Sequence, residues 1–98
     1  MAQFDVHRIA SGGLVIDCQS TLLDQLNTRF VVPLVAREAA PPPAQRLNPT
    51  FAVAGEDHVM LTQFAGAIER RELGEPVANL TAHAWDITAA LDVLLSGV

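Results

Sequence analysis

Cysteine is nearly absent from this 98-residue sequence, in which Cys18 is the only one. A single thiol cannot form an internal disulfide, and it cannot hold a metal ion without other ligands. The presence of only one cysteine favours a protein of a reducing compartment. Because Cys18 lies among apolar residues, we expect a buried, inert thiol and not a nucleophile.

Basic residues are also few. The chain has six, all of them arginines, against eleven acidic residues, and its net charge is −5. Only Arg70 and Arg71 are adjacent. Proteins that bind a phosphate backbone need basic stripes, so the sequence predicts no direct nucleic-acid binding. An acidic surface instead suits a basic protein partner.

Long apolar segments are missing as well. No run approaches the roughly 20 residues of a membrane-spanning helix. Residues 1–8 alternate between polar and apolar side chains from the start, which is unlike a signal peptide. We therefore expect a cytoplasmic protein without membrane contact, folded as one domain over residues 1–98.

Recognisable catalytic and metal-binding patterns are lacking too. No histidine stands at metal-ligand spacing from another histidine, the cysteine or a carboxylate. Serine, histidine and aspartate are present, but no nucleophile elbow marks a triad. We expect no cofactor, no metal and no enzymatic activity, and ordinary surface or edge positions for His7, His58 and His83.

The residues that are present alternate in the manner of β-strands. Residues 2–9 and 14–19 predict a hairpin around the glycines at 12 and 13, which accept a positive φ cheaply. Phe4 and Val6 share one face of the first strand. One face of the second strand carries Leu14, Ile16 and Cys18.

Residues 29–36 predict a strand that is apolar on both faces, which requires burial on both. In so small a domain we expect a second copy of the chain to cover one face. Pro33 lacks an N–H and therefore belongs at a bulge or an edge. This strand is the predicted seam of a homodimer.

The rest of the chain divides into loops, strands and one helix. Prolines make residues 38–49 a loop without helix, 50–54 and 57–64 predict a second hairpin, and 67–73 predict a strand that ends at 74–76. Thr81 is the expected cap of a helix reaching the last residue, with an apolar stripe packed on the sheet. The predicted fold is mainly β: five or six short antiparallel strands and one C-terminal helix.

Trp85 is the only tryptophan and shares a line of the predicted helix with Asp92 and Ser96. Two interpretations stay open for it. It anchors the helix surface against a sheet edge or loop, or it contacts a partner, since tryptophan is common among residues that dominate binding.

Several short motifs, in order along the whole chain, resemble the CcdB family. They are residues 3–6 (Gln-Phe-Asp-Val), 16–20 with Leu22-Leu23, 29–34 (Arg-Phe-Val-Val-Pro-Leu), and 74–80 with Asp86-Ile87 before a final helix. The resemblance implies a small SH3-like antiparallel barrel or sheet with a C-terminal helix. It also implies a homodimer that poisons DNA gyrase through its A subunit and is neutralised by a CcdA-like antitoxin.

The resemblance also assigns the contact residues. Members of the family end in Trp-Gly-Ile, whose tryptophan stacks on an arginine of the gyrase A subunit. The matching positions here are Ser96, Gly97 and Val98. Asp92 replaces an amide beside this tail, and the other matching contact positions are Gln3, Phe4, His7, Ser20 and Leu22. We expect the tail positions and Asp92 to contact gyrase, and the remaining positions with Trp85 to contact an antitoxin or another partner.

Two other functions stay open from the sequence. Ser96 lacks the ring of the family's tryptophan, which buries roughly 200 Å², so the chain could bind an antitoxin or regulator without poisoning gyrase. The second alternative is an endoribonuclease toxin of the MazF type. Its only candidate basic residues are Arg29, Arg70 and Arg71.

Overall fold

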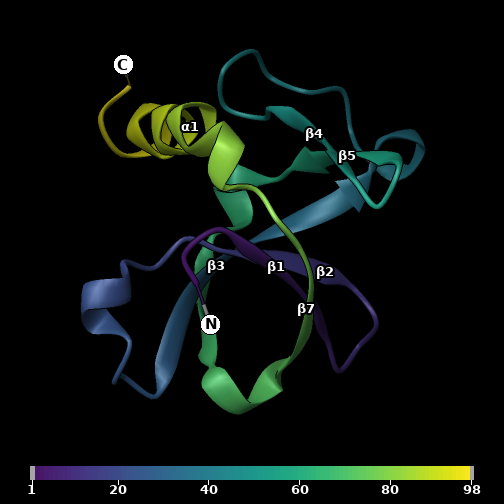
Figure 1. Cartoon of the computed structure of the whole chain (residues 1–98). Helices are drawn as coiled ribbons and strands as arrows, with labels where there is room; N and C mark the ends of the chain where they lie inside the picture. The colour runs from purple at the N-terminus through teal and green to yellow at the C-terminus, as the bar shows by residue number, and fades with distance from the viewer. Residues whose placement is uncertain (1, 98) are drawn as a thin grey trace.

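The computed structural model describes residues 2–97, which form an antiparallel sheet and one helix at the C-terminal end (Figure 1). Its elements are β1 (Asp5–Ile9), β2 (Leu14–Asp17), β3 (Thr28–Ala36), β4 (Thr50–Val53), β5 (Glu56–Met60), β6 (Gly66–Glu69), β7 (Leu73–Asn79) and α1 (Ala84–Ser96). The strand order is β4-β5-β3-β2-β1-β7. On the side of β3 that β5 occupies, β6 pairs with residues 28–31 and β5 with residues 34–36. The sheet curls into a half-barrel, and the predicted fold class is confirmed.

The main core lies between the concave face of the sheet and α1. Strand register places Val6 opposite Ile16 and Ile16 opposite Val32, so one apolar row crosses three strands. Ile87 and Ala90 of α1 are fully buried in the same cluster. The predicted faces of the first hairpin are confirmed, because Phe4, Val6, Ile16 and Cys18 all belong to this core.

The prediction that Pro33 places β3 at an edge or a bulge is wrong. β3 is an interior strand: its 31–34 segment pairs with β2, and its other side is shared by β6 and β5. On that side β6 pairs with β3 as far as Val31, and β5 pairs with it from Leu34 onward. Pro33 is tolerated because it falls between these two pairings, where no ladder hydrogen bond from its missing N–H is needed. Moreover Val31, on the face opposite the core, is only 4% exposed in the single chain. Pro33 and Val35, on the same face, are only half-buried, so a second copy over this face stays a prediction.

Two predicted strand ends are also wrong. The first strand begins at Asp5 and not at residue 2, because Phe4 has a φ of 70°, which breaks an extended chain. β7 continues through the residues expected to end a strand. Pro76 fits there because β7 is at the sheet edge. A Cβ at Gly74 would lie 2.8 Å from the Arg8 carbonyl oxygen, so only glycine lets β7 approach β1 this closely.

Short 3₁₀ turns join the strands, and three of them replace predicted structure. Residues 62–64 form a turn instead of extending β5, and Arg37–Ala39 forms one at the start of the predicted loop. After β6, a further turn at Arg70–Glu72 interrupts the single strand predicted for 67–73.

The helix begins later than predicted. Residues 81–83 form a 3₁₀ turn, and the Thr81 hydroxyl caps nothing; the Thr81 N–H instead donates to Oδ1 of Asn79 at 2.9 Å. The apolar stripe is only half right, because Ile87 is buried whereas Leu95 is 80% exposed. In residues 2–97, no helix has the length and apolar character needed to cross a membrane.

Candidate protein-contact site

The last turn of α1 is exposed and closed by an ordered cap. Gly97 adopts a left-handed conformation, with φ 81°, and its N–H donates to the Val93 carbonyl at 2.9 Å. The Ser96 hydroxyl donates to the Asp92 carbonyl at 2.8 Å, within the helix. Asp92, Ser96 and Gly97 are all exposed, and Val98 lies outside the described residues. We call residues 92–97 the helix tip.

The electrostatics of the helix tip favour a cationic visitor. The carbonyl groups at a helix C-terminus carry a partial negative charge of about half an electron. Asp92 adds a full negative charge on the exposed surface, and α1 has no basic residue in its last turn. A partner arginine or lysine would therefore be attracted to this end of the helix.

A second exposed apolar region lies in the loop between β2 and β3. Leu22 is 85% exposed in the 3₁₀ turn Thr21–Leu23, and Leu23 and Leu26 are about half as exposed, at 46% and 43%. The Ser20 side chain caps the turn by accepting the Leu22 N–H at 3.1 Å. We call residues 20–26 the leucine turn. Its exposed apolar side chains are typical of a protein-contact surface.

A buried charge network holds the leucine turn in place. Arg29 and Asp17 have no exposed side-chain surface, and Nε of Arg29 donates to Oδ2 of Asp17 at 2.9 Å. Arg29 also reaches Oδ1 of Asp24 at 3.2 Å, and Arg70 donates to the same oxygen at 2.9 Å. Gln19 adds a bond to the Leu23 carbonyl at 3.0 Å.

Our sequence reasoning missed this network. A signal was available, since Asp17 and Arg29 are opposite charges in two otherwise apolar strands that are neighbours in sequence. Burying either charge alone costs several kcal/mol, so each requires the other.

Gln3 and Phe4 lie against the end of β2, while Ser20 follows three residues later at the start of the leucine turn. Nε2 of Gln3 donates to the Cys18 carbonyl at 3.0 Å, and the Phe4 N–H donates to the Asp17 carbonyl at 2.6 Å. Gln3 is half-buried, while the Phe4 ring is in the core with residues of α1. Phe4 therefore supports the surface from below, and Gln3 is the partly accessible member.

His7 lies elsewhere. It pairs with Val15 on the face opposite the main core, is 1% exposed, and its Nδ1 lies 2.8 Å from the Gly74 carbonyl oxygen. His58 is also buried, whereas His83 is exposed and packs its ring 4.9 Å from that of Phe51. The prediction of ordinary surface or edge histidines is wrong for His7 and His58, because both occupy strand positions between well-paired neighbours.

Trp85 is 86% exposed in the first turn of α1, so it does not pack against a sheet edge. It borders a small cleft of about 260 Å³, together with Arg46, Pro49 and Asp86. This exposure contradicts the anchor interpretation and favours partner contact. Trp85 stands eleven residues before Ser96, about 16 Å along the helix at 1.5 Å per residue.

The described residues offer little for chemistry. Within residues 2–97, no group of three or more histidine, cysteine, aspartate or glutamate side chains could hold a metal ion. Burial, with a smaller effect of the Asp17 charge, raises the pKa of the Cys18 thiol to about 12. The arginines that RNA cleavage would need are each paired with a carboxylate: Arg29 with Asp17, Arg70 with Asp24, and Arg71 with Glu69.

Comparison with protein families agrees with the fold. The family model described as "CcdB protein" matches residues 3–97, which is nearly the whole chain. The match includes the first hairpin, the leucine turn and the helix tip.

Proposed function

Since the chain belongs to the CcdB family of toxin–antitoxin toxins, we propose that it inhibits DNA gyrase by binding the gyrase A subunit through the helix tip. In this proposal the protein acts in the cytoplasm as a homodimer, without catalysis of its own. A CcdA-like antitoxin neutralises it by covering the contact surface.

The observation that carries the proposal is the exposed, electronegative end of α1. Ser96 and Gly97 project from the last turn, and Asp92 lies one turn earlier on the same side. In a closed dimer the two copies would present two such tips to a two-fold symmetric target. The leucine turn would supply apolar area beside Gln3 and Ser20.

The test is expression of the chain in cells with wild-type gyrase and in cells whose gyrase A subunit is altered at the arginine that the family's tryptophan stacks on. We expect growth arrest and DNA breaks with wild-type gyrase, and normal growth with the altered subunit. Equal arrest in both strains would contradict the gyrase contact.

Ser96 favours a second candidate function, because a hydroxymethyl group replaces the tryptophan ring of the family. In this alternative the chain binds an antitoxin or a regulator and no longer poisons gyrase. Normal growth at high expression in both strains, with retained antitoxin binding, would support the alternative over the first proposal.

Changing Ser96→Trp tests the helix tip directly. The Ser96 hydroxyl bonds only within the helix, so the change should leave the fold intact. A tryptophan ring buries roughly 200 Å², and about 25 cal/mol per Å² makes this up to ~5 kcal/mol of affinity. We expect gyrase binding to strengthen at least 100-fold. Ala39→Trp, at an exposed position of the 3₁₀ turn Arg37–Ala39 and far from α1 in sequence, is the matched control. Equal effects of both substitutions would exclude the tip as the contact.

Trp85 is proposed as a partner-contact residue at the other end of α1. As the only tryptophan, it reports its own environment through intrinsic fluorescence. We expect its emission to shift to shorter wavelength when gyrase A or the antitoxin binds, and Trp85→Ala to weaken that complex. Unchanged emission and unchanged affinity for both partners would remove Trp85 from the site.

A further inference from the structure

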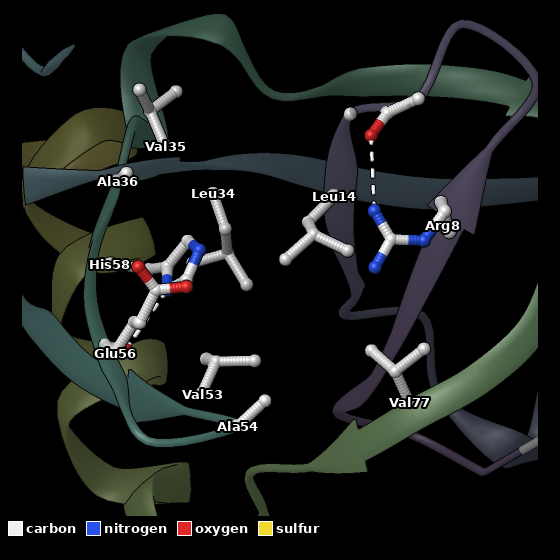
Figure 2. Close-up of a pocket in the computed structure, with 12 residues that line it drawn as sticks. Arg8, Leu14, Leu34, Val35, Ala36, Val53, Ala54, Glu56, His58 and Val77 are labelled. Carbon is white, nitrogen blue, oxygen red and sulfur yellow. Dashed lines mark hydrogen bonds between the residues drawn. The ribbon is translucent and has the colours of Figure 1, made fainter.

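The leucine turn keeps its shape without a buried side chain of its own. None of residues 20–26 is buried, and Leu22 is 85% exposed. The open cleft of about 410 Å³ in Figure 2, which Leu14 and Leu34 line, lies at the other end of β2 and β3. A loop without buried apolar contacts opens at a low free-energy cost. The orientation of the leucine turn therefore depends on its hydrogen bonds.

Two of these bonds come from the strands that the turn connects. Gln19, just before the turn, donates through Nε2 to the Leu23 carbonyl at 3.0 Å. Arg29 of β3 donates through Nη1 to Oδ1 of Asp24 at 3.2 Å. Arg29 also forms the buried ion pair with Asp17, so it cannot be changed without damage to the sheet.

Arg70 supplies a third bond from a distant part of the chain. It opens the 3₁₀ turn Arg70–Glu72, which follows β6, and it stands 46 positions after Asp24. Its Nη2 donates to Oδ1 of Asp24 at 2.9 Å, and its backbone N–H donates to the Asn27 carbonyl at 2.7 Å. The backbone bond holds the start of the Arg70 side chain beside the leucine turn, so its guanidinium reaches Asp24 from a fixed position.

Asp24 is thus held between arginines from two different elements. One hydrogen bond, from Arg29, would leave the turn free to rotate about that contact. A second charge-assisted bond, from Arg70, restricts the rotation. Leu22 and Leu23 directly precede Asp24, so fixing this carboxylate also fixes the direction in which the two leucines face.

We propose that Arg70 is a positioning residue of the contact surface. It holds Asp24 and thereby presents Leu22 and Leu23 in the orientation that the partner binds. This inference rests on the proposed function for the identity of the partner, the gyrase A subunit. Arg70 lies outside the motifs that carry the CcdB resemblance, and so the resemblance does not supply this role.

The order of the turn is measured first, in the free full-length protein. Backbone order parameters from NMR are about 0.85 for rigid segments and below about 0.6 for flexible ones. We expect residues 21–26 to change from the first class to the second in Arg70→Ala. Arg71→Ala is the matched control, because it removes the same charge from the neighbouring residue, which is 83% exposed and pairs with Glu69 instead. Unchanged order parameters and unchanged relaxation dispersion in Arg70→Ala would overturn the proposal.

Binding to the purified gyrase A subunit is measured next. A turn that is correctly oriented for a tenth of the time binds about tenfold more weakly, because affinity falls with the competent fraction. We expect this loss in Arg70→Ala, no loss in Arg71→Ala, and recovery in Arg70→Lys. Lysine can replace arginine here because only one nitrogen of the guanidinium contacts Asp24.

A double-mutant cycle separates positioning from direct contact. In a chain that carries both Leu22→Ala and Leu23→Ala, Arg70→Ala should weaken binding no further, because no leucine contact remains to be oriented. A tenfold loss that persists in this background would mean that Arg70 touches gyrase itself, which would overturn the proposal.

The side chains involved are partly exposed, at 34% for Arg70 and 51% for Asp24, so the alanine variant should fold. Urea unfolding checks this, and Arg70→Gln, which keeps the length without the charge, replaces Arg70→Ala if the latter is unfolded. Failure of this inference is separable from failure of the proposed function. Wild-type binding to gyrase A that Arg70→Ala leaves unchanged removes the inference alone. A turn that becomes flexible in Arg70→Ala, on a chain whose wild type binds no gyrase A, removes gyrase as the partner and keeps the ordering role of Arg70.

Discussion

Replacing Asp17 by asparagine should destabilise the protein strongly, because Asp17 and Arg29 form a fully buried ion pair. The side chain keeps its shape, and its Oδ1 can still accept the Gln19 N–H, now at 3.0 Å. Arg29, however, would keep its positive charge with no exposed surface, would lose the buried carboxylate that lies 2.8 Å from it, and would retain only the half-exposed Asp24 at 3.2 Å. Breaking a buried ion pair in this way costs about 3–5 kcal/mol. Small domains have only ~5–15 kcal/mol in total, so the change is large.

The measurement is urea unfolding at a fixed protomer concentration, because any oligomer makes stability depend on concentration. Asp57→Asn serves as the control, because Asp57 is exposed and the nitrogen and oxygen of its pair with Arg37 are 3.6 Å apart. We expect a loss of less than about 1 kcal/mol for it. If Asp17→Asn unfolds at the same urea concentration as Asp57→Asn, the reasoning about the buried pair is refuted.

Two further predictions concern titratable groups. With a pKa of about 12, the Cys18 thiol should react with a thiol reagent at pH 8 only when the chain unfolds; rapid labelling in native buffer would contradict its burial. Burial by itself would raise the pKa of Asp5, but the hydrogen bonds from Asn79 and from the Ala2 N–H hold it below its ordinary value of 3.8. Asp5 therefore stabilises the fold above that value, and this contribution is lost as the pH falls through the folded pKa. Between about pH 5 and pH 2, where such a carboxylate titrates, Asp5→Asn should make the melting temperature fall less steeply with decreasing pH. An unchanged fall would show that the hydrogen bonds to Asp5 do not stabilise the fold.

The alternation of apolar residues predicted the strands because one face of each is buried in the main core. Val6, Ile16 and Val32 follow that rule, and so the first hairpin and β3 were predictable. Where the strands end depends on neighbours that are distant in sequence. At Gly74, β7 passes so close to β1 that a Cβ would lie 2.8 Å from the Arg8 carbonyl oxygen, which is why glycine fits there. No local pattern in 74–76 reveals that contact.

The candidate site was predictable in part for a similar reason. Exposure of the helix tip follows from its place at the end of an amphipathic helix, and the resemblance to the CcdB family pointed to the same residues. The buried positions of Phe4 and His7 depend instead on a φ of 70° and on a hydrogen bond to Gly74, both consequences of the assembled sheet. The helical phase of Trp85 alone does not predict whether it is buried, because the phase does not say which side of α1 packs on the sheet.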